Sequence, residues 1–174
     1  MTEFLVKPYS VAEYFFINNL SQKALRLIIL VPVFAILGSF LLKGMVFTPI
    51  SVLLFIISIL IAYEISFYIS IILGLSNFWF HDIDFLRNHF DLGYRLLSGA
   101  VVPVIFLPLW LQQINGVLPF RYMLSFPVEI ITNKLSPDQL FLGFCAQIFW
   151  GILLYLGYKF MYIQGIKIYQ GYGN

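Results

Sequence analysis

Four long apolar stretches dominate this chain of 174 residues. The first, from Ala24 to Leu42, contains a single charged residue, Arg26. A helix of about 20 apolar residues, rising about 1.5 Å per residue, matches a hydrocarbon core about 30 Å thick, where lipid offers the backbone no hydrogen-bond partners. The sequence therefore predicts an all-α integral membrane protein with four transmembrane helices, over residues 24–42, 46–76, 96–111 and 139–161.

Composition excludes two broad classes of protein. Hydrophobic residues make up 61% of the chain and charged residues only 10%, far below the roughly 25% charged residues typical of soluble domains. The net charge of +2 is small and dispersed, and no basic run is present that could track a nucleic-acid backbone. We therefore expect the lipid bilayer as the surrounding medium and no nucleic acid as a partner.

The second and third stretches depart from a simple span. The second, 46–76, would be about 45 Å long as a helix, which predicts a tilt or a projection beyond the membrane. The third, 96–111, contains Pro103 and Pro108. Proline lacks the backbone N–H and obstructs the preceding turn, so we expect a kink or partial re-entry there.

Basic residues predict the orientation of the spans. Four spans place both termini on one side, and the cytoplasmic side is the one richer in Lys and Arg. Seven basic residues fall on the side of the termini and three on the other, which predicts two cytoplasmic termini. The seven are Lys7, Lys23, Arg26, Arg87, Arg95, Lys159 and Lys167, and the three are Lys43, Arg121 and Lys134.

Residues 1–22 mix apolar and charged side chains before the first span. Pro8 suits the first turn of a helix, and Glu13 then falls in its early turns. The segment predicts a cytoplasmic amphipathic helix that contacts a partner, with a simple membrane-surface anchor as the alternative.

Glu64 is the only acidic residue within an apolar stretch. Burial of its charge in lipid would cost several kcal/mol, so it is a candidate for substrate contact. The alternative is a structural role, in which Ser66 or Tyr63 hydrogen-bonds its carboxylate.

Both histidines and three carboxylates lie between Phe80 and Leu92. Such residue types can bind a metal or transfer protons, but the spacing matches no known zinc motif. We favour a connector helix capped by Asp82 or Asp84, and no phosphate-binding GxxxxGK[ST] occurs in the chain. The polar residues of this loop are His81, Asp82, Asp84, Arg87, His89 and Asp91.

The connection between the last two predicted spans is too apolar for an ordinary loop. Prolines divide it between Pro108 and Pro137, which predicts short interfacial or re-entrant helices. A membrane-hugging loop is the alternative.

Short motifs follow one another in a fixed order along the chain. They are Leu5-Val6-Lys7-Pro8, Ser98-Gly99, Pro103, Phe106-Leu107-Pro108, Leu118-Pro119-Phe120, Tyr122, Pro127, Gln147, Trp150, Gly165, Lys167, Tyr169 and Gly171. This series resembles the bacterial ABC-2 family transporter permeases of the DUF990 type, and Leu5-Val6-Lys7-Pro8 is similar to the Leu-x-x-Pro segment of that family.

The resemblance implies a permease subunit of an exporter that binds no cofactor itself, with ATP and Mg²⁺ held by a separate ATPase subunit. It also implies a second permease subunit and the bacterial plasma membrane. The expected ATPase contacts are Leu5, Lys7, Pro8, Tyr9, Glu13 and Tyr14. The expected transport pathway includes Glu64, Ser98, Gly99 and Pro103, and the expected external re-entrant residues are Pro108, Pro119, Phe120 and Pro127.

One departure from the family pattern concerns the number of spans. The family has six, so the four predicted here would correspond to the C-terminal two-thirds of such a permease, as a single partial domain over 1–174. Two rival functions remain: a membrane-embedded lipid-modifying transferase that uses the 81–91 loop, and a membrane scaffold that transports nothing. Dependence on His81, Asp82 and His89 would favour the transferase, and absence of vectorial transport the scaffold.

Overall fold

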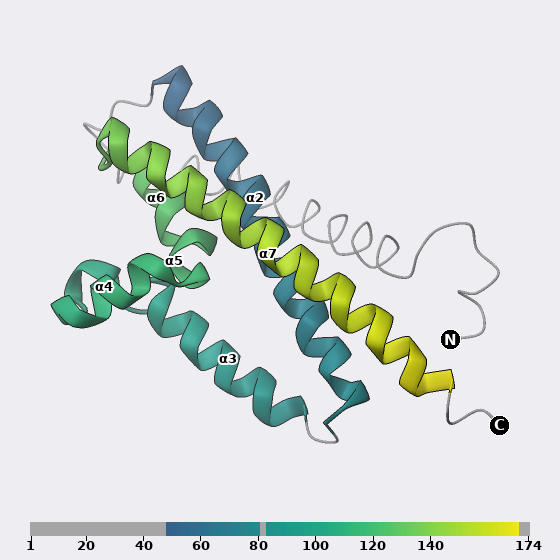
Figure 1. Ribbon diagram of the computed structural model, residues 1–174. Coiled ribbons are helices and arrows are strands. Elements are labelled where there is room, and N and C mark those ends of the chain that lie inside the picture. Colours follow the sequence, from purple (N-terminus) through teal and green to yellow (C-terminus); the bar gives the residue numbers. More distant parts are fainter. Residues whose placement is uncertain (1–47, 81–82, 171–174) are drawn as a thin grey trace, which may run out of the picture. The chain divides into compact units, whose positions relative to one another are not determined.

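A computed structural model describes residues 48–80 and 83–170. The predicted first span, 24–42, and the N-terminal segment, 1–22, lie outside these residues. The described part is helical throughout, without a strand (Figure 1). Its elements are α2 (Pro49–Leu75), the 3₁₀ turn η2 (Ser76–Phe78), α3 (Ile83–Leu97), the 3₁₀ turn η3 (Val104–Phe106), α4 (Leu109–Val117), α5 (Pro119–Met123), α6 (Ser125–Ile131) and α7 (Pro137–Gln170).

Helices α2 and α7 are each long and apolar enough to cross a membrane. An 18-residue window within Pro49–Phe78 has a mean hydropathy of 2.4, and one within Pro137–Lys167 a mean hydropathy of 1.9. Only 28% and 17% of their apolar windows are buried, whereas the core helix of a soluble protein would be mostly buried. Both helices coincide with segments in which the sequence predicts a span.

Local sequence explains where α2 begins. The hydroxyl oxygen of Thr48 accepts a hydrogen bond from the backbone N–H of Ser51 at 3.2 Å. Pro49 follows in the first turn, where its missing N–H has no cost. No proline or charged residue interrupts the helix until Glu64.

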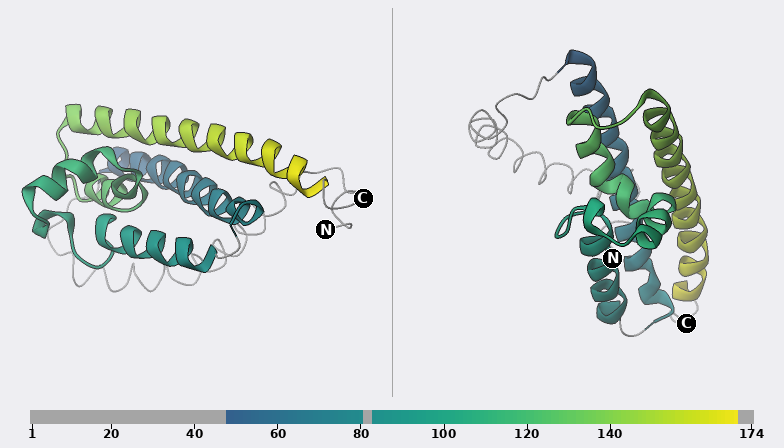
Figure 2. Two further views of the ribbon diagram at one scale, coloured as in Figure 1. Left: turned by 60° about the horizontal axis from the view of Figure 1, so that its bottom comes forward. Right: turned by 90° about the vertical axis from the view of Figure 1, so that its left-hand side faces the viewer.

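Helices α2 and α7 run side by side in the same direction (Figures 1 and 2). Ser58 of α2 meets Gln147 of α7 near their N-terminal ends, and Phe78 lies against Gly165 near their C-terminal ends. Because the two helices are parallel, the connection between them must return along their whole length. If both cross the bilayer, residues 79–136 must cross it as well.

The connection between α2 and α7, residues 79–136, which we call the return crossing, consists of several short pieces. Helix α3 leads from the C-terminal end of α2 toward its middle, while α5 and α6 pack against α2 and continue to the N-terminal end of α7 (Figure 1). Residues 96–111, where a kink or partial re-entry was expected, form no continuous helix. Helix α3 ends at Leu97, and Pro103 and Pro108 adopt extended backbone conformations just before η3 and α4. The chain turns away from the helix at Gly99, whose φ is +85°. Pro103 and Pro108 then prevent one continuous helix from forming over the rest of the stretch, because they lack the N–H donor that a helix interior needs.

Helices form in both segments that flank this stretch, as the sequence predicted. Helix α3 occupies most of the segment that was expected to form a connector helix, and Asp84 lies in its first turn. Three short helices, α4, α5 and α6, form between Pro108 and Pro137, where short helices were predicted.

A small apolar core holds the short helices against α2 and α7. It contains Ile65, Ile69, Tyr122, Phe126 and Ile130. The ring of Phe126, only 1% exposed, lies directly against Gly143 of α7, at a distance that leaves no room for a β-carbon. The close approach of α6 to α7 thus depends on a glycine.

We predict that Gly143→Ala destabilises the protein by about 1–3 kcal/mol, because the added methyl group displaces the Phe126 ring. Thermal unfolding of the purified full chain in detergent measures the effect. Gly151→Ala is the matched control, since a β-carbon at Gly151 meets nothing within 4 Å and alanine favours the helix. Equal stability of the two variants would contradict this packing.

Candidate functional site

The candidate site is the region where the return crossing changes direction, which we call the joint and define as residues 97–125. Each break in a helix leaves backbone carbonyl groups without partners inside the helix. In lipid such a group costs several kcal/mol unless another protein group binds it. The joint has to supply these partners from side chains.

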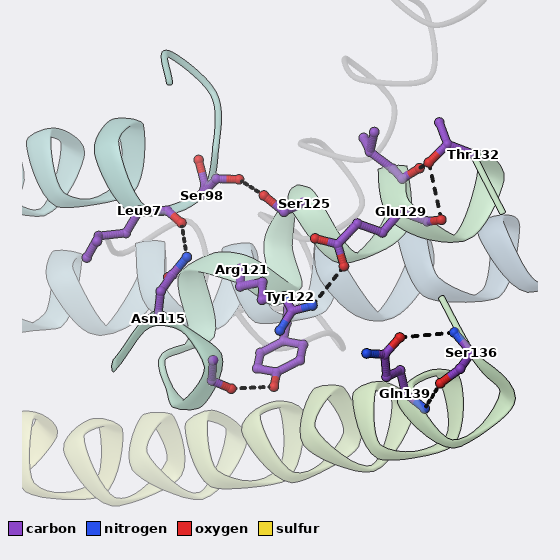
Figure 3. A network of polar contacts seen from close by, with 12 residues as sticks. Leu97, Ser98, Asn115, Arg121, Tyr122, Ser125, Glu129, Thr132, Ser136 and Gln139 are labelled. Carbon is purple, nitrogen blue, oxygen red and sulfur yellow. Dashed lines mark hydrogen bonds and ion pairs between the residues drawn. The ribbon is translucent and has the colours of Figure 1, made fainter. Parts of the chain in front are cut away.

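At the end of α3, two side chains bind the freed carbonyl groups (Figure 3). The amide nitrogen of Asn115 donates to the carbonyl oxygen of Leu97 at 2.7 Å. The hydroxyl of Ser125 donates to the carbonyl oxygen of Ser98 at 2.5 Å. These bonds tie α3 to α4 and α6, so the end of α3 is fixed by residues that follow it by 18 and 27 positions.

The carbonyl groups at the end of α4 are also bound by side chains. The hydroxyl of Tyr122 donates to the carbonyl oxygen of Gly116 at 2.6 Å, and the indole N–H of Trp150 donates to that of Val117 at 2.9 Å. Before α4, the amide of Gln112 donates to the carbonyl oxygen of Leu107 at 2.7 Å. Trp150 belongs to α7, so this span also supports the joint.

Gln147 links the joint to both long helices. Its side-chain nitrogen donates to the carbonyl oxygen of Tyr122 at 2.9 Å and to that of Ser58 at 3.1 Å, while its side-chain oxygen accepts from the Ser58 hydroxyl at 3.1 Å. Gln147 and Ser58 are both 0% exposed. Gln147 lies ten residues after Pro137, about 15 Å along α7. If α7 starts at one surface of the hydrocarbon core, Gln147 is near its middle.

Three buried polar atoms in the joint have no hydrogen-bond partner among the described residues: the hydroxyl oxygen of Ser98, the side-chain oxygen of Asn115 and Nε of Arg121. Ser98 and Asn115 are both 0% exposed. Ser98 can donate and accept, whereas this oxygen of Asn115 can only accept. The joint thus contains buried polar side chains within an otherwise apolar helix bundle.

Gly99 allows the sharp turn after α3. Its φ of +85° lies in the left-handed region that side chains disfavour, and a β-carbon there would come within 2.5 Å of the Ser125 hydroxyl. The predicted pathway residues Ser98 and Gly99 therefore lie in one tight turn, against which the Ser125 hydroxyl of α6 packs. Pro103 stands beyond it, directly before η3.

Helix α3 has one polar and one apolar face. Asp84, Arg87, Asp91 and Arg95 recur at helical spacing and are all exposed, and Ser98 continues their line into the joint. On the apolar face, Phe90 packs on Phe120 of α5, with ring centroids 5.4 Å apart. We call the charged side the polar face of α3.

Glu64 is exposed on α2, about 22 Å along the helix from Pro49. The predicted hydrogen bond from Ser66 does not form, because the Ser66 hydroxyl donates to the carbonyl oxygen of Ala62 at 2.8 Å. No hydrogen bond joins Glu64 to the joint within the described part of the chain. The structure therefore does not bring Glu64 together with Ser98 and Gly99 in one bonded group.

The remaining predicted residues fall into three groups. The expected ATPase contacts lie outside the described residues. The prolines mark helix starts or turns: Pro108 precedes α4, Pro119 begins α5, and Pro127 is buried in α6. Of the 81–91 loop, His81 and Asp82 are not described, and the described ranges contain no group of three His, Cys, Asp or Glu residues able to hold a metal.

Sequence reasoning missed how the joint is held together. It placed Gln147 only within a family pattern, and it assigned no role to Asn115 or Ser125. A signal was present in the sequence, because an amide in an apolar span usually marks a buried hydrogen bond. Its partners, however, were unreadable without the fold.

Comparison with known proteins identifies one family. A family model described as "ABC-2 family transporter protein" matches residues 1–173. No curated protein and no solved structure matches the chain.

Gln147→Leu is predicted to lower the free energy of unfolding by about 1–3 kcal/mol, because it leaves the carbonyl oxygen of Tyr122 and the hydroxyl of Ser58 buried without partners. Thermal unfolding of the full chain in detergent tests this. Ser70→Ala serves as the control, since the exposed Ser70 hydroxyl bonds only to its own helix and its loss should change stability by less than about 0.5 kcal/mol. A Gln147→Leu protein as stable as the control would show that the amide does not support the joint.

Proposed function

We propose, because this chain belongs to the ABC-2 family of transporter proteins, that it acts as a permease component of an ATP-driven exporter. The sequence carries no phosphate-binding loop, so ATP and Mg²⁺ would be bound by a separate ATPase subunit. A second permease subunit would complete the membrane part. The chain would reside in the bacterial plasma membrane with both termini in the cytoplasm, as the distribution of basic residues predicts.

The main support for the proposal is the segment that connects α2 and α7. It is divided into short helices, and one of them, α3, carries charged side chains, whereas α2 and α7 are continuous and apolar. Charged side chains within a membrane are costly and nearly always face a bundle interior or a water-filled cavity. Irregular backbone at membrane depth is likewise tolerated only where protein or water surrounds it. Transport proteins use both features to bind and release substrates within the bilayer.

The polar face of α3 would line the cytoplasmic half of the pathway. Helix α3 begins shortly after Phe80, at the C-terminal end of α2, and reaches the joint that Gln147 fixes about 15 Å from the start of α7. Asp84, Arg87, Asp91 and Arg95 would thus extend from the cytoplasmic surface to near mid-membrane. Ser98 and Gly99 would stand at the inner end of this path.

Changes in the orientation of α3 would open and close the path. The turn at Gly99 separates α3 from the segment that follows, whereas Asn115 and Ser125 bind the last carbonyls of α3. Substrate or ATP binding would shift the population between arrangements of these elements. The alternating charges of the polar face fit water and polar or charged solutes better than a bare hydrocarbon chain.

Cysteine labelling tests the path. In a Cys145→Ser background, which removes the single native thiol, we predict that Asp91→Cys and Arg95→Cys react with a membrane-impermeant thiol reagent applied from the cytoplasmic side. Leu92→Cys and Leu96→Cys, on the apolar face of the same turns, should react at least about tenfold more slowly, because lipid hardly ionises a thiol. Equal rates on both faces would contradict a water-filled path.

The N-terminal segment would transmit force from the ATPase through Leu5, Lys7, Pro8, Tyr9, Glu13 and Tyr14. Charge reversal by Lys7→Glu combined with Glu13→Lys should reduce recovery of an ATPase subunit in pull-downs from native membranes by about fivefold or more. Lys134→Glu, predicted to lie outside, is the control and should leave recovery unchanged. Full recovery with the double variant, or no ATPase with the wild type, would overturn this assignment.

A further inference from the structure

A groove of about 530 Å³ opens between the C-terminal ends of the two long helices. Trp79 and Phe80 line it just after η2, and α7 contributes the other side. Its floor is close-packed, since Phe78 lies against Gly165, where a β-carbon would come within 2.6 Å of the ring. The residues of α7 that line the groove are Phe160, Met161, Gln164 and Lys167.

The position of the groove along α7 corresponds to the headgroup layer of a membrane. Its α7 residues lie 23 to 30 positions after Pro137, about 35–45 Å along the helix. A bilayer with its headgroups is about 40–45 Å thick. If α7 starts at one membrane surface, the groove faces the headgroups and the upper acyl chains of the opposite leaflet.

The lining combines apolar walls with positive charge at one end. Trp79, Phe80 and Phe160 are 40%, 57% and 65% exposed, so their rings offer apolar surface to an occupant. Among the described residues of the lining, Lys167 is the one charged residue, and Gln164 adds an amide donor on the same helix face. Lys167 can therefore bind a phosphate, whereas the described lining offers no carboxylate to a positively charged headgroup.

We propose that this groove binds an anionic phospholipid, with an acyl chain along the aromatic walls and the phosphate at Lys167. A volume of about 530 Å³ lies within the range of about 300–1,000 Å³ typical of small-molecule sites. Basic pockets between membrane helices are a recurrent way to hold anionic headgroups. A soluble phosphate compound would leave the aromatic walls in contact with water, which favours a lipid as the occupant.

The proposal concerns a site apart from the joint and the polar face of α3. Lipid binding at the groove does not require transport activity, so a result against the proposed function would not contradict it. In the orientation proposed above, the lipid would come from the cytoplasmic leaflet, where anionic lipids attract basic residues.

Lipid titration of the purified full chain tests the proposal. Native mass spectrometry in non-ionic detergent would compare phosphatidylglycerol and phosphatidylcholine with identical dioleoyl chains. We expect tighter binding of phosphatidylglycerol, and an affinity for it about fivefold lower in Lys167→Gln, the effect of roughly 1 kcal/mol for one lysine near a headgroup. Lys159→Gln is the matched control, because Lys159 carries the same charge on the same helix but lies over the Tyr155 ring, 4.8 Å from its centroid, outside the groove lining.

Trp79 provides a second readout that does not depend on charge. Phosphatidylglycerol with brominated acyl chains should quench the fluorescence of the wild type more than that of Trp79→Phe, since the chain passes beside this ring. Several outcomes would overturn the proposal: equal affinity for the two lipids, equal losses in Lys167→Gln and Lys159→Gln, or no difference in quenching. Displacement of the lipid by glycerol phosphate would assign the groove to a soluble ligand, and shielding of Trp79 by a co-purified polypeptide would assign it to a protein.

Discussion

The satisfaction of backbone carbonyl groups inside the return crossing is the constraint on which the described structure depends. Lipid offers no donors, so each helix break must be compensated by protein. Asn115, Ser125, Tyr122 and Trp150 each donate to a carbonyl group near the end of α3 or α4. These bonds allow a chain that is neither one helix nor an open loop to pack against α2 and α7, as it must if both helices cross the bilayer.

The parallel arrangement of α2 and α7 creates the need for this crossing. Two parallel helices cannot be joined by a short turn, so the chain between them has to travel back along the bundle. Gln147 secures the crossing to both helices at once, through Ser58 of α2 and the carbonyl oxygen of Tyr122 in α5. The same residues that make the crossing possible also place the polar face of α3 beside an apolar bundle, where transport of polar solutes would need it.

Sequence reasoning predicted the long helices, the short proline-divided helices and an irregular backbone over 96–111, but it expected only a connector helix in the 81–91 loop, whereas α3 extends to Leu97. Hydropathy favoured 96–111 because this stretch is the more apolar one, whereas 83–97 carries charges. In the structure the charged segment forms the helix, since it lacks proline, while Pro103 and Pro108 interrupt the apolar one. The absence or presence of proline, rather than hydropathy, therefore determined which of the two segments forms a continuous helix.

The sequence by itself determined the membrane environment, the segments of α2 and α7, the helix breaks at proline and the family, because these follow from local composition and ordered motifs. Only the tertiary structure decided that α2 and α7 are parallel and that Asn115, Ser125 and Gln147 bind distant carbonyl groups. It also brought Trp79 and Lys167 to one groove. The physical reason is that the sequence shows where a polar side chain lies in an apolar segment and must form a hydrogen bond. Which group it binds depends on how helices that are far apart along the chain pack together.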